Sequence, residues 1–287
     1  MRNLNYQLKQ LCQRNHDGGY ATRHNRERTL TLIADQLHLL GYRRMSAQSL
    51  KPKHVEALVA RWQTDGLAIG TIKNRMSALR WWAEKVNKPS VIAQSNEHYG
   101  IPDRQLVTGV SKAQQLGSEA LERVRDTHVR MSLELQRAFG LRREEAIKFQ
   151  PHYADRGDHL LLKASWTKGG KARMIPVRTP AQRELLTRAH QLTGRGSLIP
   201  LDRDYRRQLR VYERHTANAG LTRMHGLRHA YAQERYATLT GRLAPAAGGP
   251  AVATLPLAER QRDQQVRQQI SRELGHERVQ ILSVYLS

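Results

Sequence analysis

The sequence predicts a mainly α-helical protein with one small antiparallel β-hairpin, divided into a helical N-terminal domain and a mixed α+β C-terminal domain. Three observations support this fold class. Apolar residues recur every three to four positions in residues 1–90, which is the spacing of amphipathic helices. Residues 91–117 lose that spacing and contain Pro, Gly and Ser, as is typical of a linker. Farther on, in residues 118–287, two extended runs flank a Gly-Gly turn, and a length of 287 residues suits two domains.

Four amphipathic helices are expected in the N-terminal domain. The first two show leucine and isoleucine at helical intervals: Leu4, Leu8, Leu11, Leu30, Ile33, Leu37 and Leu40. The third is expected over residues 52–64 with Ser49 as its cap, and the fourth is expected to begin at the cap Thr71. Three tryptophans on these helices are interpreted as core residues: Trp62, Trp81 and Trp82.

The fourth helix has a basic face opposite its apolar stripe. Lys73, Arg75 and Arg80 lie on this face. We expect them to contact a polyanion, although a basic face can equally be a solvated one.

The C-terminal domain is expected to begin with a helix over residues 119–139. A hairpin follows, with strands at 159–166 and 171–177 and a turn at 167–170. Further helices are expected from residues near 181, 205 and 226. Residues 240–256 are rich in Ala, Gly and Pro, and we expect this insertion to be a mobile loop.

The charge of the chain indicates its partner. Lys and Arg number 48 against 25 Asp and Glu, so the formal net charge is +23 and the pI is near 10.9. Residues 1–110 carry a net charge of +9 and the remainder +14, so both domains are expected to contact the polyanion. Nucleic acid is the leading partner because arginine binds phosphate with two parallel hydrogen bonds. An anionic membrane surface is the rival, but no apolar run approaches the ~20 residues of a membrane span.

Cysteine usage and the N-terminus indicate a cytoplasmic location. The single cysteine, Cys12, excludes an intramolecular disulfide and a cysteine-based zinc finger. The first residues lack the apolar core of a signal peptide.

Five segments of the second half form a candidate constellation for chemistry on DNA. In chain order they are Gly140-Leu141-Arg142-Arg143-Glu144-Glu145, Thr167-Lys168-Gly169-Gly170-Lys171-Ala172-Arg173-Met174-Ile175-Pro176-Val177, His225-Gly226-Leu227-Arg228-His229-Ala230, Leu274-Gly275-His276 and Tyr285. Each alone has an ordinary structural interpretation. Together, their order, local sequence and spacing resemble the tyrosine recombinase (phage-type integrase) family. Residues 71–80 are similar to the core-binding domain of that family, so the resemblance implies a helical core-binding domain followed by a tyrosine recombinase catalytic domain.

The chemistry of these residue types agrees with phosphodiester cleavage. A phenol that attacks phosphorus must lose its proton, and the charge on the nonbridging oxygens must be neutralised. Arg142 and Arg228 are suited to bind the scissile phosphate. His225 lies three residues before Arg228, so both side chains would face one site on a helix, with His225 as the base.

The resemblance assigns the remaining roles. It implies that Tyr285 is the nucleophile, that Lys168 protonates the leaving 5′-oxygen and that His276 donates a hydrogen bond to a nonbridging oxygen. Glu145 would hold the arginine and histidine in place. Lys171 and Arg173 of the hairpin are expected to contact DNA.

No metal and no other cofactor is expected, because the arginines supply the positive charge and the bond energy is conserved in a 3′-phosphotyrosine link. The implied activity is site-specific recombination of double-stranded DNA, in which the chain integrates or excises a mobile element. Assembly into a tetramer on DNA and help from DNA-bending accessory proteins are expected.

Two features depart from the family pattern. His276 follows His225 by 51 residues, and the insertion at 240–256 accounts for the excess length. Only Leu286 and Ser287 follow Tyr285, so subunit docking would have to come from the insertion or from residues 265–273, and we expect a monomer that assembles on DNA. Two alternatives stay open: a catalytically idle DNA-binding protein and a type IB topoisomerase.

Overall fold

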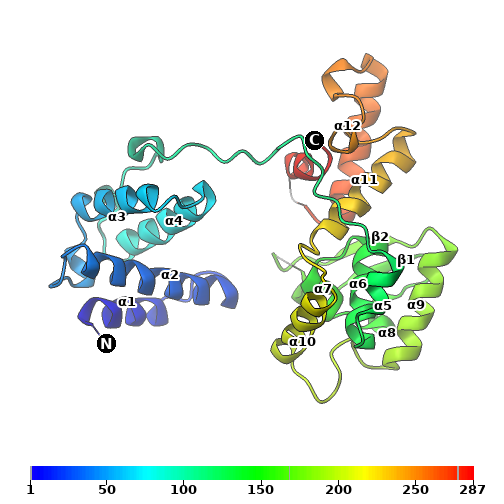
Figure 1. Cartoon of the computed structure of the whole chain (residues 1–287), viewed down its shortest axis with the longest axis horizontal. Coiled ribbons are helices and arrows are strands. Elements are labelled where there is room, and N and C mark those ends of the chain that lie inside the picture. The colour runs from blue at the N-terminus through cyan, green and yellow to red at the C-terminus, as the bar shows by residue number, and fades with distance from the viewer. Residues whose placement is uncertain (1, 168, 277) are drawn as a thin grey trace. The chain divides into compact units, whose positions relative to one another are not determined.

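The computed structural model describes residues 2–167, 169–276 and 278–287. The chain forms two compact units, Met1–Gln105 and Leu106–Ser287, each with its own core. Helices dominate both units, and the described residues contain one two-stranded sheet (Figure 1). The expected fold class is confirmed. None of the described helices is long and apolar enough to cross a membrane.

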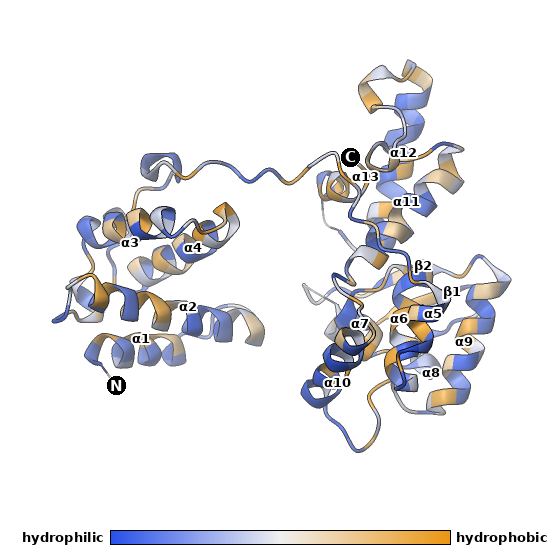
Figure 2. Cartoon of the chain, in the orientation of Figure 1, coloured by the Kyte–Doolittle hydropathy of each residue, from blue (hydrophilic) through white to orange (hydrophobic). Residues whose placement is uncertain are grey.

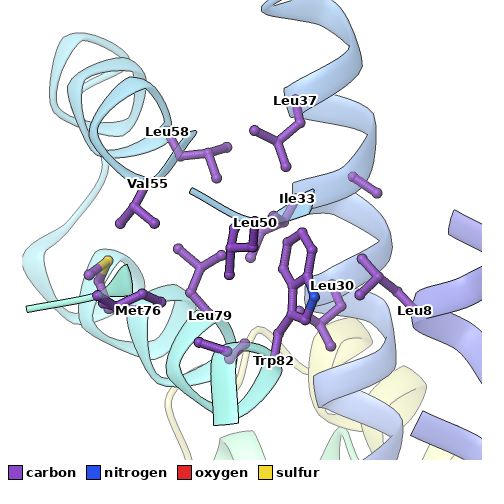
Figure 3. Packing of buried hydrophobic residues seen from close by; sticks show 14 of the residues in the cluster. Leu8, Leu30, Ile33, Leu37, Leu50, Val55, Leu58, Met76, Leu79 and Trp82 are labelled. Carbon is purple, nitrogen blue, oxygen red and sulfur yellow. The ribbon is translucent and has the colours of Figure 1, made fainter. Parts of the chain in front are cut away.

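The first unit is a bundle of four helices, α1 (Asn3–Arg14), α2 (Tyr20–Leu39), α3 (Pro52–Thr64) and α4 (Ile69–Lys85). Their apolar stripes meet in one core, shown from close by in Figure 3. The tryptophans belong to that core, as expected. Trp62 and Trp82 are fully buried, and their indole N–H groups donate to Gln36 Oε1 and to the carbonyl of Ala47.

Two of the expected helix caps are wrong. Helix α3 begins after Lys51, and Ser49 hydrogen-bonds Ser46 in a short 3₁₀ turn (Ala47–Ser49) instead. Proline at the first helical position explains this start, since its missing N–H would have no partner there anyway. Helix α4 is capped by Ala68, three residues earlier than expected, so Thr71 lies inside its first turn.

The second unit carries the remaining elements. Its helices are α5 (Ser118–Glu122), α6 (Thr127–Phe139), α7 (Arg143–Ile147), α8 (Pro151–Ala154), α9 (Pro180–Thr193), α10 (Tyr205–Asn218), α11 (Gly226–Thr240), α12 (Leu257–Glu273) and α13 (Ser283–Leu286). Strands β1 (His159–Leu162) and β2 (Arg173–Pro176) pair antiparallel, with Leu162 opposite Arg173. Helix α6 packs against both α9 and α11.

Two expected elements of this unit differ in extent. The single helix expected over 119–139 is broken, because the Asp126 carboxylate accepts from the backbone N–H groups of His128 and Val129 and so starts a new helix. The strands of the hairpin are shorter than expected. Residues 164–166 form a 3₁₀ turn in place of the end of the first strand.

The connection between the units is shorter than the linker expected over 91–117. Ile92 and Ile101 belong to the core of the first unit, and Leu116 belongs to a core of the second. The exposed stretch between these anchors covers residues 102–110. We call residues 106–117 the connector.

The insertion at 240–256, expected to be a mobile loop, folds against the C-terminal helices. It contains two 3₁₀ turns, Pro245–Ala247 and Val252–Thr254. Ala244 is almost fully buried in the same core cluster as Tyr285 and Leu286. The insertion therefore forms part of the core against which α13 packs.

Candidate active site

Tyr285 on α13 lies at the centre of a cluster of three histidines. Its hydroxyl is 3.2 Å from His225 Nε2. The Tyr285 ring centroid is 4.3 Å from that of His229 and 5.2 Å from that of His276. Only 6% of the residue is exposed, so the phenol is already docked in its own chain. Within the described residues, the structure brings together Arg142, Glu145, His225, Arg228, His276 and Tyr285.

Helix α11 positions three of these groups. His225 is its N-terminal cap residue, and Arg228 lies within its first turn. His229 follows His225 by four residues, so both rings lie on one face of the helix. Sequence reasoning missed His229, although its spacing from His225 was a signal that it faces the same site.

Arg228 is the most deeply buried cation of the site, with 1% of the residue exposed. It donates to the carbonyls of Gly140 (2.5 Å) and Leu274, which tie α11 to the segments that carry Arg142 and His276. Burial, together with the nearby charges of Arg142 and Arg173, lowers the pKa of Arg228 to about 10, so it stays charged at neutral pH. Its carbon Cζ is 5.9 Å from the Tyr285 ring centroid.

Glu145 on α7 organises the arginines. Its carboxylate is fully buried and accepts two hydrogen bonds from Arg173, at 2.6 and 2.7 Å. It also accepts from the backbone N–H and the Nη1 of Arg142, at 2.7 and 2.9 Å. Burial favours the neutral acid, but the hydrogen bonds and charges of the arginines outweigh it and lower the pKa of Glu145 to about 2.

The expectation that Arg173 contacts DNA is wrong. Its side chain is only 7% exposed, and both of its Nη atoms are committed to Glu145. Gly275 is required beside it, because a Cβ there would lie 2.7 Å from Arg173 Cδ and the backbone has a φ of +64°. The glycine of the Leu274-Gly275-His276 segment therefore makes room for a buried arginine.

The three histidines are neutral at physiological pH. Burial and the charge of Arg228 lower the pKa of His225, and with Arg142 and Arg173 they lower that of His276 to about 3. Burial, followed by His225 and Lys112, lowers the pKa of His229 to about 4. A neutral His225 can accept the proton of Tyr285, which is what a general base requires.

The proton of His276 is placed by its neighbour. Its Nε2 lies 3.3 Å from Arg228 Nη2, and a guanidinium can only donate. The ring proton is therefore on Nδ1, which is buried and has no hydrogen-bond partner among the described residues. The donation expected of this residue stays a prediction.

Lys168, expected at the tip of the β-hairpin, lies outside the described residues. Among the flanking residues, the Thr167 hydroxyl lies 3.0 Å from the carbonyl oxygen of Ala164 and 2.6 Å from the carbonyl oxygen of Lys171. These contacts close the turn. The roles expected of Lys168 and Lys171 stay predictions.

The three cations of the basic face expected on α4 are partly exposed and contact their own chain, and their contact with DNA stays a prediction. Arg80 donates to the carbonyl of Ala93 and to Asn96 Oδ1, and it holds this segment against the helix. Lys73 pairs with Asp103 at 2.5 Å, and the Arg75 guanidinium lies 5.3 Å from the Trp62 ring centroid. All three cations bind their own chain.

A basic surface that sequence reasoning missed lies on α10. Figure 2 shows this helix as mostly hydrophilic. Its exposed arginines are Arg206, Arg207, Arg210 and Arg214. A cavity of about 340 Å³ between α10 and the site is lined by Arg143, Arg223 and His225, among other residues. The signal in the sequence was the density of arginine along one predicted helix.

The described residues contain no group of three or more His, Cys, Asp or Glu side chains that could hold a metal ion. The positive charge of the site comes from arginines.

Two family models match the chain. Residues 1–89 match the model described as phage integrase, N-terminal, and residues 104–234 match the model described as integrase. His276 and Tyr285 lie beyond these matched residues. None of the curated proteins matches the chain.

Solved structures share the fold at low sequence identity. A lambda integrase(75-356) dimer bound to a COC′ core site has a TM-score of 0.64 and 14% identity, covering 99% of this chain and 95% of that chain. The site-specific recombinase XerH, in a post-cleavage complex with a palindromic difH substrate, has a TM-score of 0.59 and 17% identity, covering 99% and 81%. The Tn1549 transposon integrase in complex with circular intermediate DNA has a TM-score of 0.59 and 14% identity, covering 100% and 96%.

Proposed function

Because the chain belongs to the tyrosine recombinase (phage integrase) family, we propose that it is a site-specific DNA recombinase that cleaves and rejoins strands through Tyr285. The observation that carries the assignment of the nucleophile is the 3.2 Å separation between the Tyr285 hydroxyl and Nε2 of a neutral His225, beside the buried Arg228. A phenol, a base and a fixed cation thus share one site.

This geometry supports the following cleavage step. The Tyr285 oxygen attacks phosphorus as His225 takes its proton, and the bond from phosphorus to the 5′-oxygen breaks. Arg142 and Arg228 neutralise the nonbridging oxygens, a type of contribution worth roughly 3 kcal/mol per donor in other enzymes. The leaving 5′-oxygen needs a proton, for which Lys168 is our proposed source. A 5′-hydroxyl of a partner strand reverses the step and releases Tyr285.

The docked position of Tyr285 supports attack in cis, on the phosphate held by the same protomer. Tyr285 is within reach of its own His225, and no second copy of the chain is needed to complete this pair. We propose that the chain assembles into a tetramer on DNA for strand exchange. DNA-bending accessory proteins and a role in the integration or excision of a mobile element are also part of the proposal.

The activity can be tested without knowing the natural site. A duplex library with a random core is selected for binding to the full chain, and the selected duplex is nicked next to the cleavage position so that the released strand diffuses away. The wild type is expected to form a covalent adduct that resists denaturant, and Tyr285→Phe is expected to form none. A selected duplex that is bound but never trapped would instead support the idle DNA-binding protein. Strand exchange between two duplexes, as opposed to plasmid relaxation alone, separates a recombinase from a type IB topoisomerase.

A further inference from the structure

One face of α11 contacts Tyr285 at three different groups. Residues 225, 229 and 233 are spaced four apart, so their side chains lie in one row. His225 lies at the hydroxyl and His229 at the ring. Gln233, which the proposed chemistry does not use, donates from Nε2 to the backbone carbonyl of Tyr285 at 2.9 Å and is 9% exposed.

The amide of Gln233 is held in this orientation by Ser111 of the connector. The Ser111 hydroxyl donates to Gln233 Oε1 at 3.0 Å, and it accepts from the backbone N–H of Ala113 at 3.2 Å. An amide oxygen that accepts from Ser111 leaves the amide nitrogen to face Tyr285. Two hydrogen bonds in series therefore join the connector to the proposed nucleophile.

The connector is fixed at close range on α11. It passes beside this helix before it enters α5 (Figure 1), and the backbone N–H of Gln114 donates to the carbonyl of Gly226 at 3.0 Å. A Cβ at position 226 would lie 2.2 Å from Gln114 Cγ and 2.7 Å from the carbonyl oxygen of Lys112. Glycine between His225 and Leu227 thus permits the approach that brings Ser111 to Gln233.

Helix α13 needs such support. It has 4 residues, which is too short to be stable by itself. Its apolar side rests on the core through the buried Leu286, and Arg267 Nη1 donates to Ser287 Oγ at 3.3 Å. The Gln233 bond is made to the backbone of Tyr285 itself, so it bears directly on where the phenol lies.

We infer that Gln233 is a positioning residue for Tyr285 and that Ser111 ties it to the connector, so that the packing of the connector on α11 sets the placement of the nucleophile. This inference rests on the proposed recombinase function. It gives the connector between the units a part in the chemistry.

The test measures the rate of adduct formation in a single turnover, with the nicked duplex selected for the full chain. Gln233→Leu removes both hydrogen bonds and is expected to slow adduct formation about tenfold, as loss of a buried hydrogen bond at a reacting group implies. Ser111→Ala removes one bond and is expected to slow it about threefold. Ser111→Thr, which keeps the hydroxyl, and Glu234→Gln, an exposed neighbour on α11, are expected to react at the wild-type rate.

A second reaction separates positioning of Tyr285 from general damage to the site. In a Tyr285→Phe background, the substrate carries a 3′-p-nitrophenyl phosphate next to a strand with a free 5′-hydroxyl. The 5′-hydroxyl loses its proton to the solvent as its oxygen attacks phosphorus, the bond from phosphorus to the p-nitrophenyl oxygen breaks and p-nitrophenolate leaves. The arginines are therefore needed but Tyr285 is not. Gln233→Leu and Ser111→Ala are expected to join these strands at the rate of the background protein.

The outcomes are distinct. Absence of any wild-type adduct would overturn the recombinase function, and this inference with it. A wild-type adduct with an unchanged rate in both Gln233→Leu and Ser111→Ala would overturn the inference alone. Equal losses in the two reactions would show that the variants damage the whole site, which also contradicts a positioning role. If Gln233→Leu is unfolded at the assay temperature, the comparison of Ser111→Ala with Ser111→Thr tests the inference instead. Equal rates of adduct formation in these two variants would contradict it.

Discussion

The Glu145 carboxylate is fully buried among Arg142, Arg173 and Arg228, and the charge balance of the site depends on it. We predict that Glu145→Gln lowers the free energy of unfolding by roughly 3 kcal/mol, because it leaves buried arginines without their counter-charge. Chemical denaturation at neutral pH measures this change. Glu144→Gln, one residue earlier, removes only a pair with Lys148 on an exposed carboxylate and is expected to change stability by less than ~1 kcal/mol.

The same residue gives a pH dependence whose sign is fixed. The folded-state pKa of Glu145, about 2, is below its ordinary value, so its contribution to stability is complete above the pKa of the unfolded chain, ~4.3, and is lost as the pH falls toward 2. Between these values the wild type is expected to lose more stability on acidification than Glu145→Gln does. Parallel unfolding curves for the two proteins across this range would contradict the pKa.

The three histidines around Tyr285 give another prediction at the residue scale. Burial and nearby arginines lower their pKa values, that of His229 to about 4 and that of His276 to about 3. We expect NMR titration of the DNA-free chain to show the His229 and His276 imidazoles neutral at pH 6.5, the ordinary pKa of histidine. The His225 imidazole is expected to be more than half neutral at that pH, because its pKa is lowered. Binding of DNA is expected to raise the pKa of His225, since a phosphate favours the imidazolium. A His225 pKa above 6.5 in the absence of DNA would argue against a neutral imidazole that can accept the Tyr285 proton.

At the scale of the element, arginines divide into those that hold the fold and those available for DNA. The exposed Arg207 and Arg210 of α10 belong to the second group. We predict that replacing both by Ala reduces the slope of log Kd against log salt concentration by about 2, as loss of two phosphate contacts requires. Fluorescence anisotropy over a range of salt concentrations measures the slope.

The matched control for that experiment is Arg80→Ala on α4. Arg80 binds Ala93 and Asn96 of its own unit, so its loss is expected to lower the thermal stability of the first unit and to leave the salt slope unchanged. If Arg80→Ala changes the slope and the α10 variant does not, the roles of the two helices are reversed.

The sequence predicted much of the site because its residues lie in short motifs. His225 and Arg228 are three positions apart on a helix, and Glu145 is three positions after Arg142, so local geometry alone brings each pair together. Arg173 was misread for a tertiary reason. Along a short strand an arginine indicates solvent or DNA, and only the fold shows that Glu145, 28 residues earlier, lies beneath it.

Contacts between distant segments were equally invisible in the sequence. Ser111 and Gln233 are 122 positions apart, and neither belongs to a motif. The break before Thr127 could have been predicted from the sequence, however, because Asp126 is a strong cap residue that interrupts an otherwise continuous apolar pattern. Local rules thus predict helices and motifs, whereas support of the nucleophile depends on packing.

At the scale of the whole molecule, two compact units are joined by a short exposed stretch. Leu106 and Val107 are 58% and 39% exposed, and they belong to no helix or strand. We predict that thermolysin cleaves the free chain first near these residues and leaves two folded fragments, because extended exposed backbone fits a protease and helical backbone does not. Leu39 is the internal control: it is 69% exposed but lies at the end of α2, and cleavage there is expected to be slower.

The response of this cleavage to DNA tests whether both units bind the same duplex. Residues 1–110 and the remainder carry net charges of +9 and +14, so each is suited to hold a polyanion. If both bind one duplex, the stretch between them loses freedom, and the selected DNA is expected to slow cleavage near Leu106 much more than cleavage at Leu39. Mass spectrometry of a digestion time course identifies both positions. If DNA protects both positions equally, or protects neither, DNA binding does not restrain the exposed stretch between the units. The packing of the connector on α11 would then be independent of what the first unit binds.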